Sequence, residues 1–137
     1  MVGKDTLDLT KNELEIMSLM WTQHKPLSRS EIIDLSPERS WKASSIHILL
    51  NQLLEKEAIV VDGYVKTGKN YGRTYSAAIT PEEYQAMQIK QGAAFFQSKS
   101  AALTSLVSEL IKDEDIDDET LDRLEAILRE KRRNAKL

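Results

Sequence analysis

Hydrophobic residues in the first half of the chain recur at the spacing of buried helix and strand faces. The stretch 43–57 shows the helical pattern most completely. Its apolar residues follow the i, i+3, i+4, i+7, i+8 rule and are Ile46, Leu49, Leu50, Leu53 and Leu54. Further helices are predicted over about 11–23 and 29–35. The stretches 59–66 and 73–79 are rich in β-branched and aromatic residues, which predicts two strands joined by the glycine-bounded turn TGKNYG.

Polar residues at the expected helix starts support these boundaries. Three starts carry a capping box, in which a Ser or Thr hydroxyl and a Glu three residues later each accept from a backbone N–H group. The boxes are Thr10 with Glu13, Ser28 with Glu31, and Thr80 with Glu83. Asp117 is the expected cap of a last helix. The helix starts are therefore indicated both by the spacing of apolar residues and by the capping residues.

The second half of the chain is expected to be helical, over about 81–98, 100–112 and 118–133. The last two helices carry an apolar stripe on one side. Short helices cannot bury such stripes alone, and a second copy of the chain is the simplest cover. The residues expected to form a dimer contact are Leu103, Leu106, Val107, Leu110, Leu121, Leu124, Ile127 and Leu128.

The order of three helices, two strands and a helical tail is typical of one fold class. It predicts a mainly α protein, with a winged helix-turn-helix domain of three helices plus a β-hairpin wing over residues 1–79. Residues 80–137 are then expected to be a helical C-terminal dimerisation region. In a winged helix-turn-helix domain the third helix enters the major groove of DNA.

The side of the 43–57 helix opposite its apolar face carries small hydroxyl groups, an imidazole and an amide. These belong to Ser44, Ser45, His47 and Asn51. Such groups can meet base edges in a major groove. Periodicity alone favours a solvated face, whereas the expected fold favours contact with DNA.

Composition narrows the classes of protein that are possible. The chain has 137 residues, is 41% hydrophobic and 30% charged, and has no cysteine, which excludes disulfides and thiolate chemistry. No apolar run approaches the roughly 18 residues of a membrane span, and the start MVGKDTLDLT lacks a signal-peptide core. We therefore expect a cytoplasmic protein with no membrane partner. No nucleophile–base arrangement or phosphate loop is present, so neither an enzyme nor a cofactor is expected.

Charge is distributed unevenly along the chain. The net charge is −3, but residues 40–79 carry five Lys or Arg against three Asp or Glu, and residues 80–137 carry nine against twelve. This distribution permits DNA binding without demonstrating it. In the expected wing, Lys66, Lys69 and Arg73 either contact phosphates or belong to an ordinary charged hairpin.

Two features could suggest a metal site, and neither meets the requirements of one. The run DEDIDDE at 113–119 opens with the spacing of an EF-hand loop, but its sixth position is Asp118 rather than glycine and its twelfth is Leu124 rather than glutamate. The two histidines, His24 and His47, have no thiol partners. We expect no metal.

Four segments together resemble one family of regulators. They are LTKNELEIMSLMW, SWKASSIHILLNQLLEKEAI, GRTYSAAIT and the tail SLVSELIKDEDIDDETLDRLEAILREK. From about Leu9 to about Lys131 the chain resembles the penicillinase and methicillin-resistance repressors (the BlaI/MecI type, with the related copper-responsive CopY repressors). The resemblance implies a homodimeric transcriptional repressor that binds a palindromic operator in double-stranded DNA.

The resemblance also implies roles for particular residues. The recognition-helix positions of the family fall on Ser44, Ser45, His47 and Ile48. The tryptophan that precedes this helix in the family is Trp41. Where the family often has Ser-Pro, this chain has Lys42 and Ala43, so Lys42 becomes a further candidate for a phosphate contact.

Induction is less well indicated than DNA binding. In the antibiotic-responsive relatives, an upstream membrane sensor-protease leads to cleavage of an Asn-Phe bond, and the aligned pair here is Glu109-Leu110. The cysteine-rich metal-sensing tail of CopY-type repressors is absent. Two other functions stay open: a winged-helix module for protein–protein assembly, and a small-molecule-responsive regulator with a pocket between its domains.

Overall fold

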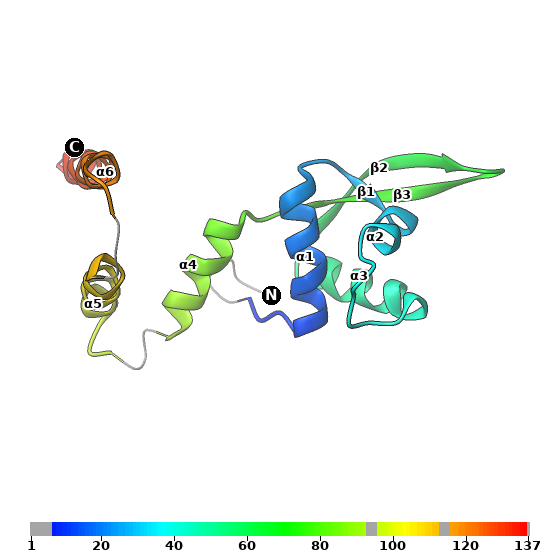
Figure 1. Cartoon of the computed structure of the whole chain (residues 1–137), viewed down its shortest axis with the longest axis horizontal. Coiled ribbons are helices and arrows are strands. Elements are labelled where there is room, and N and C mark those ends of the chain that lie inside the picture. The colour runs from blue at the N-terminus through cyan, green and yellow to red at the C-terminus, as the bar shows by residue number, and fades with distance from the viewer. Residues whose placement is uncertain (1–6, 93–95, 113–115, 137) are drawn as a thin grey trace. The chain divides into compact units, whose positions relative to one another are not determined.

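The computed structural model describes residues 7–92, 96–112 and 116–136, and its elements are shown in Figure 1. Contacts divide the chain into two compact units, Met1–Gly92 and Ala93–Leu137. The elements of the first unit are α1 (Lys11–Gln23), β1 (Leu27–Ser28), α2 (Arg29–Asp34), η1 (Ala43–Ser45), α3 (Ile46–Glu55), β2 (Ile59–Thr67), β3 (Asn70–Ala77) and α4 (Pro81–Gly92). The second unit contains α5 (Lys99–Lys112) and α6 (Asp118–Ala135).

The first unit is a winged helix, as predicted. Its three strands form an antiparallel sheet in the order β1-β3-β2. The β2–β3 ribbon extends beyond the helices α1, α2 and α3 (Figure 1). The predicted fold class, mainly α with three helices, a hairpin wing and a helical tail, is confirmed.

The ribbon is longer and its turn tighter than predicted. Because β2 continues to Thr67 and β3 starts at Asn70, only Gly68 and Lys69 remain between the strands. Gly68 has φ +64°, a left-handed conformation that glycine adopts without steric cost. Most of the segment predicted as a turn is therefore strand.

Two local features of the first unit were missed by periodicity. The strand β1 has only two residues, Leu27 and Ser28, which pair with Tyr75 and Thr74 of β3. It is too short to show a period of its own. The predicted helix over 43–57 begins as the short 3-10 turn η1 and ends at Glu55. Lys42 stands at the cap of η1 and makes no side-chain cap hydrogen bond.

The predicted capping boxes are all formed. The backbone N–H groups of Glu13, Glu31 and Glu83 donate to the hydroxyl oxygens of Thr10, Ser28 and Thr80 at 3.2, 3.2 and 3.0 Å. The three glutamates accept in return from the backbone N–H of their cap residues. Asp117 caps α6 by accepting from the backbone N–H of Thr120 at 2.8 Å.

The core of the first unit is formed by the predicted apolar faces. Its largest fully buried apolar side chains are Ile16, Met17, Leu27, Ile32, Leu50, Leu53 and Ile59. On α3, Ile46 and Leu49 are also buried, and Leu54 is partly buried against the same cluster. The opposite side of α3 is therefore turned outward.

Glu13 is the only charged residue buried within the described part of the chain. The ammonium of Lys56 lies 2.6 Å from Glu13 Oε1 and also donates to the backbone carbonyl of Asp8 at 2.7 Å. Burial raises the pKa of Glu13, but the hydrogen bonds from Lys56 and Thr10 outweigh it, so the pKa lies below its ordinary value of 4.5. This pair joins the start of α1 to the end of α3.

We expect Lys56→Met to lower the free energy of unfolding by roughly 1.5–3 kcal/mol, because a buried carboxylate loses a charged partner. Urea unfolding at pH 7 measures this loss.

Glu13→Gln isolates the effect of the ionisation of Glu13 on stability. Since the folded pKa of Glu13 is depressed, its ionised form contributes stability above pH 4.5 that is lost as the pH falls below that value. The free energy of unfolding, measured with urea at pH 7 and at pH 4, should fall more between these pH values for wild type than for Glu13→Gln. An equal fall for the two proteins would contradict this account.

The helix α4 packs with the first unit. Tyr84 and Met87 join the core, and the ring of Tyr84 lies 5.9 Å from that of Trp21. The side chain of Gln88 donates to the backbone carbonyl of Leu7 at 2.9 Å. The first compact unit consequently extends to Gly92, past the division at residue 80 expected from the sequence.

The predicted helix over 81–98 is shorter than expected. The helix α4 ends at Gly92, residues 93–95 lie outside the described part, and residues 96–98 are not helical. Within the described residues, no helix has the length and apolar character needed to cross a membrane.

Candidate nucleic-acid interface

The outward side of α3 and η1 carries the polar groups singled out from the sequence. Ser44, His47 and Asn51 are exposed, and Ser45 is half-buried. The apolar Ile48 on the same side is 61% exposed. A large aliphatic side chain left in water beside small polar groups is available for contact with another molecule.

The segment between α2 and α3 is held by Arg39 and Trp41. Trp41 is buried, and the guanidinium of Arg39 lies 5.3 Å from the centre of its ring. Arg39 also donates to the backbone carbonyl of Ser36 at 3.1 Å. These contacts hold the segment that leads into η1 and α3 against the core, so the outward residues of α3 belong to a packed part of the protein.

The register of the wing decides which of its side chains face the helices. Residues paired across the strands share one side of a ribbon, so Tyr64 lies with Arg73, and Lys66 with Tyr71. Along β3, side chains alternate, which places Arg73 and Tyr71 on the same side as Tyr75. Because Tyr75 is buried, this side of the ribbon faces the helical core at its base, whereas Tyr71 nearer the tip is 71% exposed.

A hollow of about 320 Å³ lies where α2, α3 and β3 approach one another. It brings together His47, Asn51 and Arg73, three of the residues expected to bind DNA. The complete lining is Ser28, Arg29, Ser30, His47, Asn51, Tyr71, Gly72, Arg73 and Tyr75. The lining contains two guanidinium groups and no carboxylate, which makes the hollow suitable for an anion.

Arg29 is a member of this site that the sequence pattern did not reveal. Its Nη1 lies 3.2 Å from Nδ1 of His47 and closer to Nε2, and it donates to whichever of these ring nitrogens carries no hydrogen. The two residues stand 18 positions apart on different helices, so helical periodicity could not connect them. The sequence indicated only that Arg29 is the first residue of a helix, because it directly follows the capping residue Ser28.

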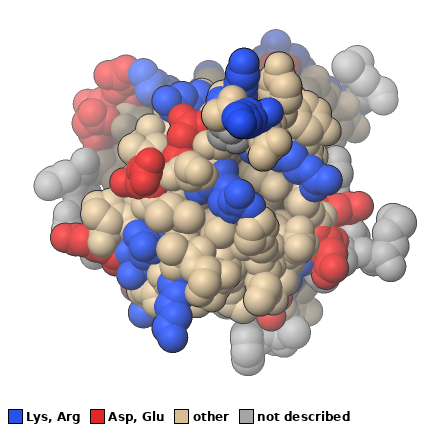
Figure 2. All heavy atoms as spheres, turned by 90° about the vertical axis from the view of Figure 1, so that its right-hand side faces the viewer, with Lys and Arg blue, Asp and Glu red and all other residues tan. Residues whose placement is uncertain are grey.

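The other basic residues expected at the interface do not line the hollow. Lys42 precedes η1, Lys66 lies on β2, and Lys69 is in the turn of the wing. All three are exposed. Seen from the side toward which the wing projects, basic side chains are spread over the middle of the surface (Figure 2).

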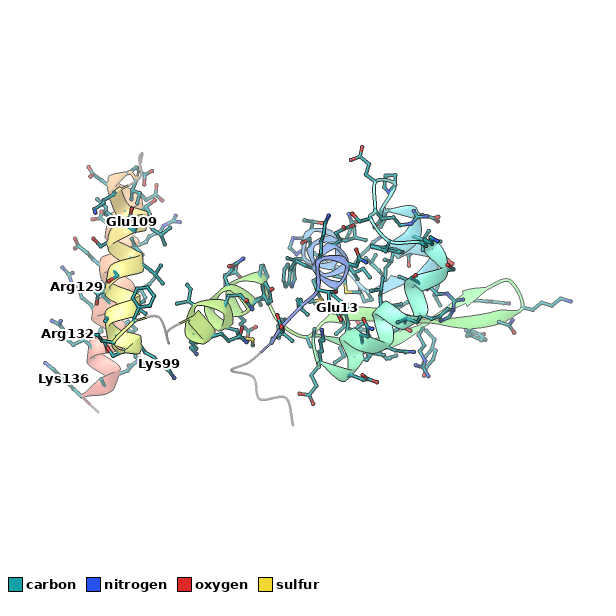
Figure 3. All side chains as sticks on the ribbon, turned by 90° about the horizontal axis from the view of Figure 1, so that it is seen from below. Glu13, Lys99, Glu109, Arg129, Arg132 and Lys136 are labelled. Atoms are coloured by element: carbon teal, nitrogen blue, oxygen red, sulfur yellow. The ribbon has the colours of Figure 1, made fainter. Side chains whose placement is uncertain are left out.

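The tail residues expected to form a dimer are mostly exposed within one chain. Leu103, Leu110, Ile127 and Leu128 are 61%, 68%, 63% and 68% exposed, while Leu106 and Leu121 are half-buried. Val107 and Leu124 are 40% and 36% exposed. Arg129 and Arg132 of α6 are also exposed, as is Lys136, which directly follows this helix (Figure 3).

An apolar groove lies between α5 and α6. It has a volume of about 590 Å³, and its lining is formed by Leu103, Thr104, Val107, Ser108, Ile111, Lys112 and Leu128. Most of this lining is aliphatic. The second unit therefore presents an open and mostly aliphatic groove to solvent.

Two other possible sites receive no support from the described residues. No group of three or more His, Asp or Glu side chains there could hold a metal ion, and residues 113–115 of the acidic run lie outside the described part. A hollow of about 460 Å³ at the start of α4 is lined by Trp21, His24, Lys25 and Ile79, among others. None of the unpartnered buried polar atoms of the described part lies in its lining, so nothing there identifies a ligand.

The model of the penicillinase repressor family matches residues 9–130. The chain belongs to the penicillinase repressor family. The match spans the winged helix and nearly all of α5 and α6. The resemblance found in the sequence is thereby confirmed, and the chain is a DNA-binding transcriptional regulator of this family rather than an enzyme.

The individual relatives found by sequence share a quarter to a third of their aligned residues with this chain. The chain is 25% identical over 125 residues to the penicillinase repressor of Bacillus licheniformis, covering 90% of this chain and 91% of that protein. It is 32% identical over 87 residues to an uncharacterized 16.5 kDa protein of Latilactobacillus sakei, covering 64% of this chain but only 55% of that protein.

The solved structures to which the chain shows similarity include two regulators from Staphylococcus aureus. One is MepR, a transcription regulator of the multidrug efflux pump MepA, with 14% identity, a TM-score of 0.41, and coverage of 93% of this chain and 81% of that one. The other is MarR in complex with salicylate and kanamycin, with 14% identity, a TM-score of 0.38, and coverage of 90% and 70%.

Proposed function

We propose that this member of the penicillinase repressor family is a homodimeric repressor, which binds a palindromic operator through α3 and the wing. The observation that carries the proposal is the hollow shared by α2, α3 and β3. It places His47 and Asn51 of the outward face of α3 beside Arg73 of the wing. A groove-reading helix and a phosphate-binding ribbon thus act on adjacent parts of one duplex.

The outward face of α3 is proposed to read bases. Ser44 and Ser45 are short enough to allow the backbone close approach, and His47 can donate to a purine N7. The exposed aliphatic side chain of Ile48 suits contact with a thymine methyl group. Asn51 lies about one turn farther along and can reach a base or a phosphate.

Dimerisation is proposed to bury the apolar surface of α5 and α6. The groove between these helices is open and aliphatic, and a second copy supplies the same kind of surface in return. A two-fold dimer presents two recognition helices to two half-sites, which matches a palindromic operator.

The wing is proposed to contact phosphates. We expect Lys69→Ala combined with Arg73→Ala to weaken binding to all DNA sequences about equally and to reduce the salt slope by about 0.9 for each phosphate that is no longer bound. The measurement is fluorescence anisotropy with operator and random duplexes at several salt concentrations. As a control, Lys99→Ala with Lys136→Ala removes two exposed charges of the tail. Equal slopes for the wing variant and wild type would reduce the wing to a charged hairpin.

The proposed function is tested by binding of the purified chain to the promoter of its own operon. Preference for that promoter over random DNA of the same length is the expected result. If no preference is found at any salt concentration, the polar face of α3 does not read DNA. A winged-helix module for protein assembly then becomes the better account.

An upstream sensor-protease is the least supported partner. The aligned pair Glu109-Leu110 differs from the Asn-Phe bond of the antibiotic-responsive relatives and lies within the helix α5. Proteases act on extended chain, so cleavage there requires local unfolding of α5. We therefore propose no proteolytic step for induction.

A further inference from the structure

We propose that Arg29 bridges His47 and a phosphate of the operator backbone, and that it thereby orients His47 toward a purine base. This inference rests on the proposed function, because it assigns a role to Arg29 within the DNA interface. It makes Arg29 of α2 a specificity-determining residue, although its own contact with DNA is to the backbone.

Arg29 of α2 and His47 of α3 are in direct contact. Arg29 Nη1 donates to the ring of His47, and Arg29 makes no other hydrogen bond or ion pair with the described residues. A guanidinium group has five N–H donors in a planar fork. Most of its donors consequently remain available after His47 is bound.

The hollow beside this contact is rich in positive charge. Arg29 and Arg73 both line it, from α2 and β3, and neither forms an ion pair with a described carboxylate. The remaining lining residues include no carboxylate, and most of them carry hydroxyl, amide or imidazole groups. Two guanidinium groups without a carboxylate partner favour an anion, and phosphate oxygens match the geometry of the guanidinium fork.

The contact with Arg29 also determines which hydrogen bonds the imidazole of His47 can make. A guanidinium group can only donate, so His47 accepts from Arg29. A neutral imidazole accepts through one nitrogen and carries its hydrogen on the other. In the proposed complex, the ring nitrogen that carries the hydrogen donates to DNA, which suits the N7 of guanine or adenine and the O6 of guanine.

The test compares Arg29→Ala, Arg29→Lys, His47→Ala and the Arg29→Ala/His47→Ala double variant in the full chain. For each, affinity is measured on the promoter duplex and on random duplex over a series of salt concentrations. Lys25→Ala is the matched control. It removes one exposed positive charge near Arg29 in the sequence, from a residue that does not line the hollow. Circular dichroism melting verifies that each variant is folded.

Arg29→Ala is expected to reduce the salt slope by about 0.9, so a fourfold rise in salt costs the variant about 3.5-fold less affinity than it costs wild type. It should also reduce the preference for the promoter, by roughly five- to 150-fold, the range for one missing base contact. Arg29→Lys keeps the charge and should keep the slope. It should still lose preference, because an ammonium group lacks the fork needed to hold a ring and a phosphate together.

The double variant decides whether the two residues act together. If Arg29 works through His47, the double variant should have the same promoter preference as His47→Ala alone. Fully additive losses of preference, or an unchanged slope in Arg29→Ala with Lys25→Ala as reference, would overturn the bridge while leaving the proposed function intact. A wild-type chain that shows no promoter preference would overturn both.

Discussion

Leu128→Asp is expected to convert the protein from a dimer into a folded monomer. Leu128 is 68% exposed within one chain, so a carboxylate there meets water in the monomer and costs it little. In the proposed dimer the same position faces the groove between α5 and α6. A charge placed there without a partner opposes association.

The expected size of this effect is large because the change occurs twice in a symmetric dimer. Each buried leucine contributes roughly 1.5–3 kcal/mol, so the two changes together cost roughly 3–6 kcal/mol. The dimer dissociation constant should rise by a factor on the order of 10² to 10⁴. Sedimentation equilibrium at micromolar concentration measures this directly, and operator affinity should fall in parallel.

Ala126→Asp is the matched control for the dimer. Ala126 lies on the same helix two positions earlier, is exposed, and points away from the apolar stripe. The introduced charge is identical, so this variant should remain dimeric. A wild-type chain that sediments as a monomer at micromolar concentration, or a Leu128→Asp chain that stays dimeric, would refute the proposed interface.

Ser45→Ala combined with His47→Ala is expected to remove most of the preference for the operator. Each base contact that is removed should cost about 1–3 kcal/mol on the operator and little on random DNA. Ser45 is half-buried and His47 exposed, and neither belongs to the apolar core, so folding should be retained. Competition binding with operator and random duplexes gives the specificity ratio.

The control for this double variant is Ser18→Ala. Ser18 is an exposed polar residue of α1, away from the outward face of α3, and it does not line the hollow. It should bind operator and random DNA as wild type does. If the double variant dimerises and keeps the wild-type ratio, α3 does not read sequence through these side chains, and protein assembly becomes the better function for this face.

Features determined by neighbouring residues could be predicted from the sequence. Helix starts depended on capping boxes such as Thr10 with Glu13, and these formed as expected. The buried side of α3 depended on the spacing of Ile46, Leu49 and Leu53, which is a property of a single helix. Such signals are local, and the tertiary structure did not override them.

Features determined by distant residues could not be predicted in this way. The strand β1 exists because Leu27 pairs with Tyr75, and the position of α4 depends on contacts of Tyr84 with the core. Arg29 gained its place in the site only when α2 and α3 packed together. A pattern read along one helix contains no information about which residue of another helix will meet it.

The packing of α4 determines which fragment of the protein can be studied alone. A fragment ending at Ile79 lacks Tyr84 and Met87, so it loses two buried side chains and the ring beside Trp21. It also leaves the carbonyl of Leu7 without its amide donors. A fragment that continues to Gly92 retains all of these interactions. The smallest fragment that carries the complete core of the first unit therefore ends with α4.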